Sequence, residues 1–171
     1  RKELRNVKIK TIYNGIKLES YKKKSIKKEF KLKKNSKILL MLAEYNLRKG
    51  HNFIIKVMDE IYKKQKNVYL LIFGSSKKDK FYEIKNLVKN SNVKNNVILS
   101  GFRRDKFNLI DQSDIIVVPS QEYESFGYSA LEAMCIKKPV VASNVGGLPE
   151  VILNNKTGFI VEKDNYKKFA Q

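Results

Sequence analysis

Five short runs of apolar, often β-branched residues recur along the chain, and segments with helical periodicity separate them. The runs cover residues 37–43, 68–74, 96–101, 114–120 and 139–143. They are almost continuously apolar, which is typical of strands that are covered on both faces of a parallel sheet. The spacing of apolar residues predicts helices over residues 52–64, 79–89, 105–112 and 128–136. Alternating strands and helices predict βαβ units and an α/β fold with a doubly wound parallel sheet flanked by helices.

The length of 171 residues suits one domain. No apolar run approaches the roughly 20 residues of a membrane-spanning helix. The single cysteine, Cys135, cannot form a disulfide within the chain, and this fits a reducing compartment. We therefore expect a cytoplasmic protein.

The formal net charge of +19 comes almost entirely from lysine, because arginine occurs only at Arg1, Arg5, Arg48, Arg103 and Arg104. Proteins that read nucleic acids rely on arginine for phosphates and base edges, so we expect no nucleic-acid partner. The lysine-rich run over residues 21–34 is interpreted as a solvated helix face. The alternative is attraction to anionic substrates or peripheral contact with an anionic membrane, at the inner face of the cell membrane.

Charged residues follow the predicted strands, at the edge where open α/β sheets bind their ligands. Glu44, Arg48 and Lys49 follow the first run, and Arg103 and Arg104 follow the third. Neither a G-x-G-x-x-G loop nor a Walker loop is present, so a nucleotide would have to bind in another way.

After the fourth run comes "YESFGYSALEAM", residues 123–134, with Glu124 and Glu132 eight positions apart around a predicted helix start. Gly127 lets the backbone approach a ligand, and the free amides of the first turn suit a phosphate. Carboxylates accept hydrogen bonds from vicinal hydroxyls. A nucleotide diphosphate sugar, with hydroxyls at both ends and phosphates between them, fits this arrangement.

Two other interpretations remain open on spacing alone. Glu124 can be a carboxylate favoured by the helix dipole and Glu132 a surface residue, and short patterns of this kind match by chance. The pair could also be the acid and base of a glycosidase, although a cationic loop nearby would lower the raised pKa that the acid needs.

Other features of the sequence are weaker signals. The loop "NVGGLPEV", residues 144–151, is either a tight turn or a ligand contact, with Pro149 in a first helical turn. His51 is interpreted as a capping or packing residue. No metal-ligand cluster is apparent, so we expect neither a metal nor another cofactor.

The stretch "ESFGYSALEAMCIKKPVVASNVGGLPEVILNNKTGFIV", residues 124–161, resembles the C-terminal signature of glycosyltransferase family 4 (group 1), retaining transferases of the GT-B fold. The resemblance includes the two glutamates, the loop at residues 146–150 and the Lys49-Gly50 pair. It spans nearly the whole chain.

The resemblance implies a Rossmann-like domain that forms the C-terminal half of a GT-B fold. Residues 16–171 would be the C-terminal nucleotide-sugar-binding domain, and residues 1–15 an interdomain linker and first strand. The sugar would pass from a nucleotide-sugar donor to a glycan or lipid-linked acceptor, bound by an N-terminal domain that is absent from this chain. The expected setting is the synthesis of lipopolysaccharide or capsule, without a metal.

The resemblance also implies residue roles. Lys49 would contact the diphosphate, Glu124 the hydroxyls of the transferred sugar and Glu132 the ribose. Glu124 and Lys49 are the expected catalytic residues. The expected donor-binding residues are Glu44, Arg48, Lys49, Phe102, Arg103, Glu124, Ser125, Phe126, Gly127, Tyr128, Ser129 and Glu132.

The chain departs from the family at one position near the predicted site, and two alternative functions are possible for it. The family often has Gly-Arg where this chain has Ala43-Glu44, so Arg48, Arg103 or Arg104 would replace that arginine, or Glu44 has a different role. The alternatives are a sugar-nucleotide epimerase or phosphorylase of similar fold, and a nucleotide-binding module without catalysis.

Overall fold

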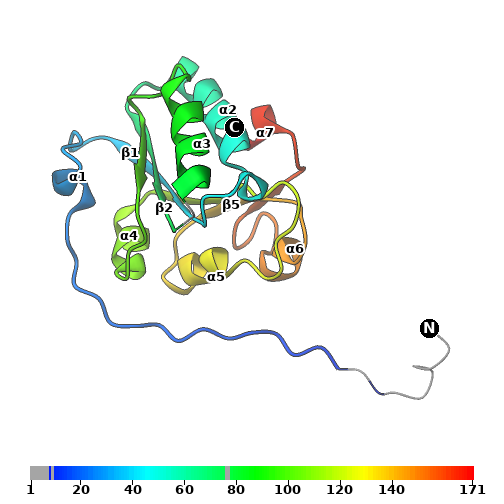
Figure 1. Cartoon of the computed structure of the whole chain (residues 1–171). Helices are drawn as coiled ribbons and strands as arrows, with labels where there is room; N and C mark the ends of the chain where they lie inside the picture. Colours follow the sequence, from blue (N-terminus) through cyan, green and yellow to red (C-terminus); the bar gives the residue numbers. More distant parts are fainter. Residues whose placement is uncertain (1–7, 9, 76–77) are drawn as a thin grey trace.

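A six-stranded parallel sheet organises the protein (Figure 1). The computed structural model describes residue 8 and residues 10–75 and 78–171. The strand order is β3-β2-β1-β4-β5-β6. The strands are β1 (Lys37–Leu42), β2 (Val68–Phe73), β3 (Val97–Ser100), β4 (Ile115–Val118), β5 (Val140–Ser143) and β6 (Phe159–Val161).

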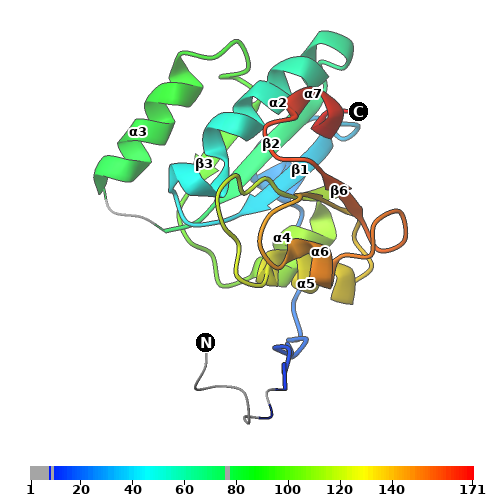
Figure 2. The ribbon, with the colours of Figure 1, turned by 90° about the vertical axis from the view of Figure 1, so that its right-hand side faces the viewer.

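Helices cover both faces of the sheet (Figure 2). On one face lie α2 (His51–Lys64), α3 (Lys78–Lys89) and α7 (Tyr166–Phe169). On the other lie α4 (Lys106–Gln112), α5 (Tyr128–Cys135) and α6 (Leu148–Val151), and the short α1 (Ile26–Glu29) shares their hydrophobic core. A one-turn 3-10 helix, η1 (Leu47–Lys49), precedes α2. The predicted doubly wound, Rossmann-like α/β fold is confirmed.

Alternate residues of β1 pack into two different cores, which explains why its sequence is continuously apolar. Ile38 and Leu40 belong to the core beneath α4 and α5, whereas Leu39 and Met41 belong to the core beneath α2 and α3. All four side chains are buried. A strand that faces water on one side would need polar residues at every second position.

The direction of winding reverses beside β1. The chain runs outward from β1 to β2 and β3, and then returns to the other side of β1 as β4, with Leu39 opposite Ile115. The crevice at the carboxyl ends of β1 and β4 is therefore the switch point at which sheets of this kind bind ligands.

Two details differ from the sequence predictions. The sixth strand was not predicted, because Phe159–Val161 is only three residues long. Leu131, Met134 and Cys135 predict the buried side of the helix at residues 128–136, and this prediction is wrong in part. The buried residues of this helix include Ala130 and Ala133, whereas Cys135 is exposed. Small residues face the sheet because α5 lies close to β4 and β5.

The N-terminal segment is an extended arm without regular structure over residues 10–25 (Figure 1). The apolar run at residues 7–12 is where the first strand expected within residues 1–15 would lie. Val7 and Ile9 lie outside the described residues, and the described positions of the run are not in a strand. The lysine-rich run at residues 21–34 is solvated, but its only helix is the four-residue α1. The Tyr13 hydroxyl donates to Glu150 Oε2 at 2.9 Å, and the Tyr21 ring stacks on Phe107.

Among the helices of the described residues, none combines the length and apolar character that crossing a membrane requires.

Candidate functional site

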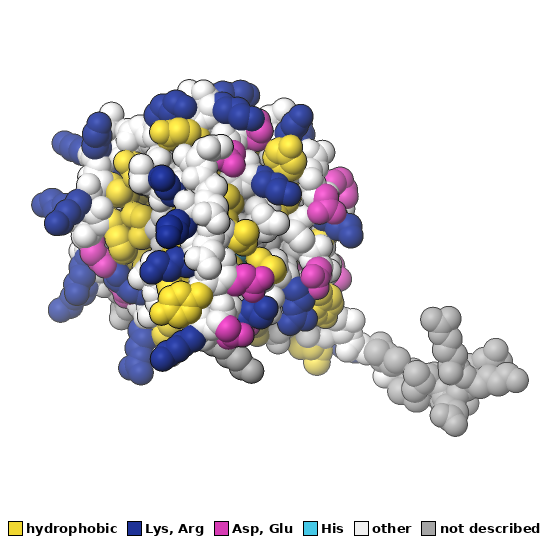
Figure 3. All heavy atoms as spheres, turned by 45° about the horizontal axis from the view of Figure 1, so that its top comes forward, with side chains coloured by type: hydrophobic (Ala, Val, Ile, Leu, Met, Phe, Trp, Pro, Cys, Tyr) yellow, Lys and Arg dark blue, Asp and Glu magenta, His cyan; other side chains and the backbone are white. Residues whose placement is uncertain are grey.

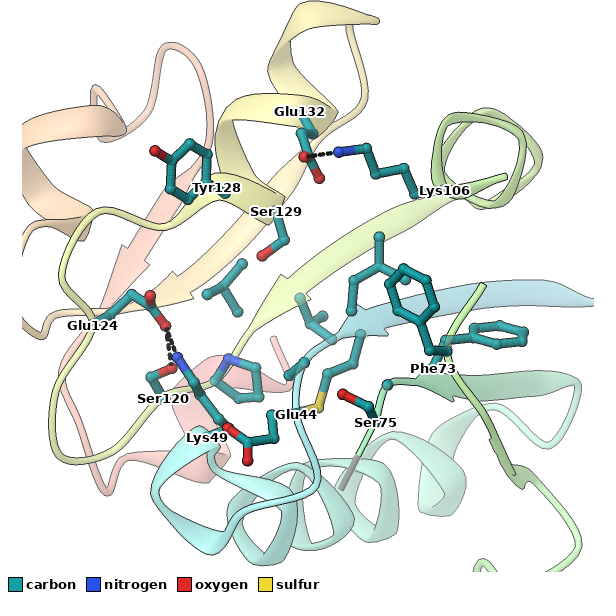
Figure 4. A pocket seen from close by; sticks show the side chains of 18 of the residues that line it. Glu44, Lys49, Phe73, Ser75, Lys106, Ser120, Glu124, Tyr128, Ser129 and Glu132 are labelled. Atoms are coloured by element: carbon teal, nitrogen blue, oxygen red, sulfur yellow. Dashed lines mark hydrogen bonds and ion pairs between the residues drawn. The ribbon is translucent and has the colours of Figure 1, made fainter. Parts of the chain in front are cut away.

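A cavity of about 440 Å³ opens at the switch point, over the carboxyl ends of β1, β2 and β4 (Figure 4). Its floor is apolar and includes Met41, Phe73 and Val117. Its rim carries charged and hydroxyl side chains from the segments that follow β1, β2, β3 and β4. These polar lining residues are Glu44, Lys49, Ser75, Arg103, Lys106, Ser120, Glu124, Tyr128, Ser129 and Glu132.

Lys49 is placed by a tightly fixed turn. The Asn46 side chain accepts a hydrogen bond from the Arg48 amide and caps η1. Gly50 follows with a φ of 84°, and a Cβ built there would lie 1.8 Å from the carbonyl oxygen of Pro119. The Gln121 amide donates to the Arg48 carbonyl at 3.0 Å. The turn therefore packs directly against the end of β4.

The Lys49 ammonium pairs with Glu124 across the cavity rim. Lys49 Nζ lies 2.7 Å from Glu124 Oε2, and the Ser120 hydroxyl donates to the same oxygen at 3.1 Å. The two charged side chains are 31% and 14% exposed. The pair is only partly solvated, so its attraction is screened less than that of a surface ion pair.

A second pair of opposite charges lies on the far side of the cavity. Lys106 Nζ donates to Glu132 Oε1 at 2.6 Å. Glu132 is 8% exposed, so the interpretation of Glu132 as a surface residue is wrong. Figure 4 shows the Lys49–Glu124 and Lys106–Glu132 pairs on opposite walls, with Ser129 between them.

Arg103 is held by two carboxylates. Its guanidinium donates to both oxygens of Asp105, at 2.8 and 2.6 Å, and to Glu29 of α1. The hydrogen bonds and charge of Asp105 and Glu29 raise the pKa of Arg103 above its usual value. With both neighbours engaged, Arg103 is poorly placed to replace the arginine that the family often has near residue 44.

The amino-terminal end of α5 faces the same cavity. Gly127 precedes the helix with a φ of 83°, and within the described part of the chain no side chain caps this end. The loop at residues 144–151 supports it from behind. A Cβ on Gly146 would lie 2.0 Å from the Glu124 carbonyl oxygen, to which the Gly147 amide donates a hydrogen bond. The tight-turn interpretation of this loop fits these contacts, and none of its residues lines the cavity.

Two polar residues, the buried His51 and the half-buried Gln121, fix the loops around the cavity. His51 is fully buried, and its Nδ1 lies 2.9 Å from the Asn46 carbonyl oxygen. Burial lowers the pKa of His51 to about 4, so the ring is neutral at pH 7. The Gln121 side chain donates to the Pro119 carbonyl and to the Ser143 hydroxyl, and its oxygen accepts from the Asp164 amide. His51 is thus a packing residue, as predicted.

The structure brings together eight of the twelve predicted donor-binding residues at the cavity: Glu44, Lys49, Phe102, Arg103, Glu124, Tyr128, Ser129 and Glu132. Arg48, Ser125, Phe126 and Gly127 do not line it. Arg48 and Ser125 are exposed, Phe126 is half-buried and Gly127 is buried. Phe102 is 70% exposed and also borders a smaller cavity of about 360 Å³ with Tyr45, Phe81 and Tyr82.

Sequence reasoning missed Lys106, Ser120 and Gln121. Lys106 gave no signal because a lysine in the first turn of a helix is unremarkable in a lysine-rich chain. Ser120 did end a predicted strand. Because ligands of such sheets bind at the carboxyl ends of the strands, Ser120 could have been predicted to lie at the site.

The described residues contain no group of three or more His, Cys, Asp or Glu side chains placed to hold a metal ion.

Comparisons with known proteins identify the family. The family model described as glycosyl transferases group 1 matches residues 22–171. N-acetyl-alpha-D-glucosaminyl L-malate synthase of Bacillus anthracis is 31% identical over 160 residues, which are 92% of this chain and 41% of that protein. The capsular polysaccharide biosynthesis glycosyltransferase CapM of Staphylococcus aureus is 29% identical over 166 residues, 92% of this chain and 42% of that protein. The chain thus spans about two fifths of these relatives.

Solved structures similar to this chain are also glycosyltransferases. A glycosyltransferase from Rickettsia africae has a TM-score of 0.78 at 33% identity, over 85% of this chain and 38% of that one. A mutant of S. aureus TarM, solved with fondaparinux, alpha-GlcNAc-glycerol and UDP, has a TM-score of 0.79 at 28% identity, over 99% of this chain and 32% of that one. The resemblance to the group 1 GT-B enzymes is confirmed. This chain belongs to the group 1 glycosyl transferases.

Proposed function

We propose that this chain is the donor-binding domain of a glycosyltransferase that moves a sugar, with retention, from a nucleotide diphosphate sugar to a glycan or lipid-linked acceptor. The observation that carries the proposal is the pair of lysine–carboxylate contacts on opposite walls of one cavity, with the start of α5 between them. Each contact holds a cation and an acceptor close together. A ligand that carries both anionic and hydroxyl groups can use both partners.

The diphosphate would bind at the Lys49 side of the cavity. Its charge would draw Lys49 away from Glu124, and the amides at the start of α5 would add hydrogen bonds and a favourable dipole. Glu124 would then be free to accept hydrogen bonds from the hydroxyls of the transferred sugar. In this exchange Glu124 gives up the ammonium but keeps hydrogen-bond donors, from Ser120 and from the sugar hydroxyls, so its partly buried carboxylate stays hydrogen-bonded.

The nucleoside would occupy the opposite side. Glu132 would accept hydrogen bonds from the ribose hydroxyls while it keeps its contact with Lys106. The exposed ring of Phe102, at the border between the two cavities, would stack on the base. Lys106 therefore joins the predicted donor-binding residues in this proposal.

Transfer breaks the bond between the anomeric carbon and a phosphate oxygen, and the electron pair remains on the departing diphosphate. The acceptor hydroxyl oxygen would form the new bond to the anomeric carbon, and its proton would pass to the diphosphate. Lys49 and the amides at the start of α5 are fixed before reaction and would stabilise that charge. Glu124, beside the reacting carbon, is the second proposed catalytic residue. We propose that transfer needs no added metal, and an assay of the complete enzyme with and without EDTA tests this. Retention is proposed because of the family to which the chain belongs.

The relatives support a role in surface polysaccharides. The protein from the S. aureus capsule system is named for capsular polysaccharide biosynthesis, and the TarM complex contains UDP. A cytoplasmic location and peripheral contact with an anionic membrane are part of the same proposal.

A thermal-shift screen of nucleotides and nucleotide sugars tests donor binding. A ligand present at about 100 times its Kd stabilises the folded state by roughly 2.7 kcal/mol, which is easily measured. We expect one nucleoside diphosphate and its sugar to raise Tm, and Lys49→Ala to reduce the shift to less than about half. Lys163→Ala is the matched control, because Lys163 is an exposed loop lysine outside the cavity. Absence of any shift across the screen would contradict the proposal.

Transfer by the complete enzyme separates the proposal from its alternatives. Labelled sugar that appears in an acceptor supports a transferase. Inversion of a ring carbon in the free donor would instead indicate an epimerase, and binding without turnover would indicate a non-catalytic module.

A further inference from the structure

Eleven of the lysines of this protein lie at one edge of the sheet. Because all six strands are parallel, the segments that lead into them meet at the same edge, which we call the amino edge. The segments before β1 and β2 bring Lys31, Lys33, Lys34, Lys63, Lys64 and Lys66. The segments before β3, β5 and β6 bring Lys89, Lys94, Lys137, Lys138 and Lys156. All of these lysines are exposed except Lys138, which is half-buried.

Carboxylates are almost absent from these segments. The segment before β4 brings the two acidic residues, Asp111 and Asp114, and they pair with Lys23 and Lys37, each at 3.1 Å. Of the lysines that form the amino edge, Lys63 alone is in an ion pair within the described part of the chain, with Glu60. None of the other ten lysines is in an ion pair within the described residues, so the positive field of this edge extends into solvent.

The opposite edge of the sheet is balanced. The loops that leave the strands place Glu124 beside Lys49 and Asp105 beside Arg103. Asp164 follows Lys163 in sequence. The positive field is therefore a property of one edge and not of the lysine-rich composition alone. Figure 3 shows Lys and Arg side chains spread over the upper rim of the domain.

Two apolar side chains lie at the same edge. Leu153 and Phe159 flank the turn that leads into β6, and they are 58% and 54% exposed. Lys156 lies between them in sequence. Exposed Leu and Phe beside lysines are the combination that binds the interface of an anionic bilayer. Nucleic-acid recognition favours arginine, and the described arginines, Arg48, Arg103 and Arg104, all follow the carboxyl ends of strands.

We propose that the amino edge is a docking surface for a lipid bilayer with anionic headgroups. The lysines would lie over the headgroups, and Leu153 and Phe159 would enter the interface. This adds a specific surface to the membrane contact in the proposed function. It does not depend on the cavity, which opens at the other edge of the sheet.

Co-sedimentation with vesicles tests the proposal. The 171-residue chain is expected to bind vesicles of phosphatidylcholine with phosphatidylglycerol, not phosphatidylcholine alone, and to be released as salt rises from about 0.1 to about 0.5 M. Each lysine near an anionic surface contributes about fivefold to partitioning. The triple variant Lys33→Glu, Lys64→Glu, Lys66→Glu is therefore expected to bind at least tenfold more weakly.

Two controls make the result specific. The variant Lys17→Glu, Lys80→Glu, Lys163→Glu has the same net charge, but its substitutions lie on the arm and at the other edge, so it should lose far less binding. Leu153→Ser with Phe159→Ser should weaken vesicle binding and leave any duplex DNA binding unchanged. Nucleotide binding, measured on every variant, reports the cavity separately and confirms folding.

Three outcomes would overturn the proposal: equal binding to neutral and anionic vesicles, equal losses in the two charge-reversal variants, or tighter binding to duplex DNA than to the anionic vesicles. The last outcome would identify a nucleic acid as the partner of this edge.

Discussion

His51 joins the Lys49 turn to the interior of the domain. Its ring lies beside Tyr45, with centroids 5.5 Å apart, and its Nδ1 donates to the carbonyl oxygen of Asn46. The buried Nε2 of His51 has no hydrogen-bond partner among the described residues. A proton on that nitrogen would have to remain in the interior, so the folded protein disfavours the imidazolium.

The stability of the domain is expected to fall as pH decreases from 6.5 to about 4. The pKa of His51 is about 4 in the folded protein and near its ordinary value of 6.5 in the unfolded chain. Between these values the unfolded state binds a proton that the folded state does not, so acid favours unfolding. The full effect is roughly 3 kcal/mol. Urea unfolding at several pH values measures it.

The matched variant is His51→Asn, whose side-chain amide can still donate to Asn46. Carboxylates also titrate in this range, but they do so in both proteins. The difference between wild type and variant should therefore shrink as pH falls, and a difference that is independent of pH would contradict the assignment.

Lys49→Ala is expected to weaken nucleoside diphosphate binding by roughly 1.5–3 kcal/mol, the contribution of a hydrogen bond between charged groups. Glu124 loses its ion-pair partner in this variant but keeps the hydrogen bond from Ser120. The fold should therefore persist. Calorimetry on Lys49→Ala and Lys163→Ala gives the comparison, and equal affinities would remove Lys49 from the site.

Glu124→Gln and Glu132→Gln are expected to differ in which ligand they affect. Glu124→Gln should weaken binding of the nucleotide sugar while plain nucleotide binds at least as well, because Lys49 is released from its partner. Glu132→Gln should weaken both ligands, since both contain the ribose. The measurement is the ratio of the two affinities in each variant, and loss of plain nucleotide binding in both would refute this division.

The sequence identified the two glutamates and Lys49 through a family motif, but it could not pair them. The Lys49–Glu124 contact joins residues 75 positions apart, and the Lys106–Glu132 contact joins residues 26 positions apart. Such contacts depend on strand order, which local patterns do not specify. The burial of Glu132 was missed for the same reason. A carboxylate is seldom buried unless a cation pairs with it, and the sequence does not show that Lys106 is that cation.

At the scale of elements, two glycines begin the helices that flank the cavity. Both Gly50 and Gly127 have left-handed φ values, 84° and 83°. Their surroundings differ. A Cβ on Gly50 would meet the backbone of Pro119 at 1.8 Å, whereas one on Gly127 would meet the Leu148 side chain at 2.5 Å.

Gly50→Ala is therefore expected to be more destabilising than Gly127→Ala. The left-handed backbone alone costs an alanine roughly 1–2 kcal/mol at either position. Leu148 can change its rotamer, but the Pro119 carbonyl cannot move without the end of β4, so Gly50→Ala should exceed about 4 kcal/mol. Thermal unfolding of both variants measures the difference. Equal losses would show that the turn before α2 can shift.

Helices and strands were predicted well where their own residues determine them. The five predicted strands exist because each has a continuous run of at least three apolar residues, and the helix at residues 52–64 differs from α2 by one position. The predictions failed where tertiary contacts decide. Phe159–Val161 becomes a strand through pairing with β5, and Ile12, which is described, has no neighbouring strand in the sheet.

At the scale of the molecule, we expect these 171 residues to bind nucleotide but not to transfer sugar. The cavity lies within the described residues, yet the relatives are more than twice as long as the matched region. Alignment of the reacting groups can lower the activation barrier by roughly 7–11 kcal/mol. Without a domain that holds the acceptor in place, this lowering is lost. A binding titration and a transfer assay on one preparation test both statements, and transfer by this chain alone would contradict the second.

The parallel sheet separates the lysine-rich edge from the cavity by the length of its strands. A strand of six residues such as β1 spans about 20 Å. With the amino edge resting on lipid, the reacting carbon would stand at least that far above the headgroups. The domain would then act as a spacer that selects acceptors by their reach: a glycan of several sugars could extend to the cavity, whereas the first sugar of a lipid anchor could not.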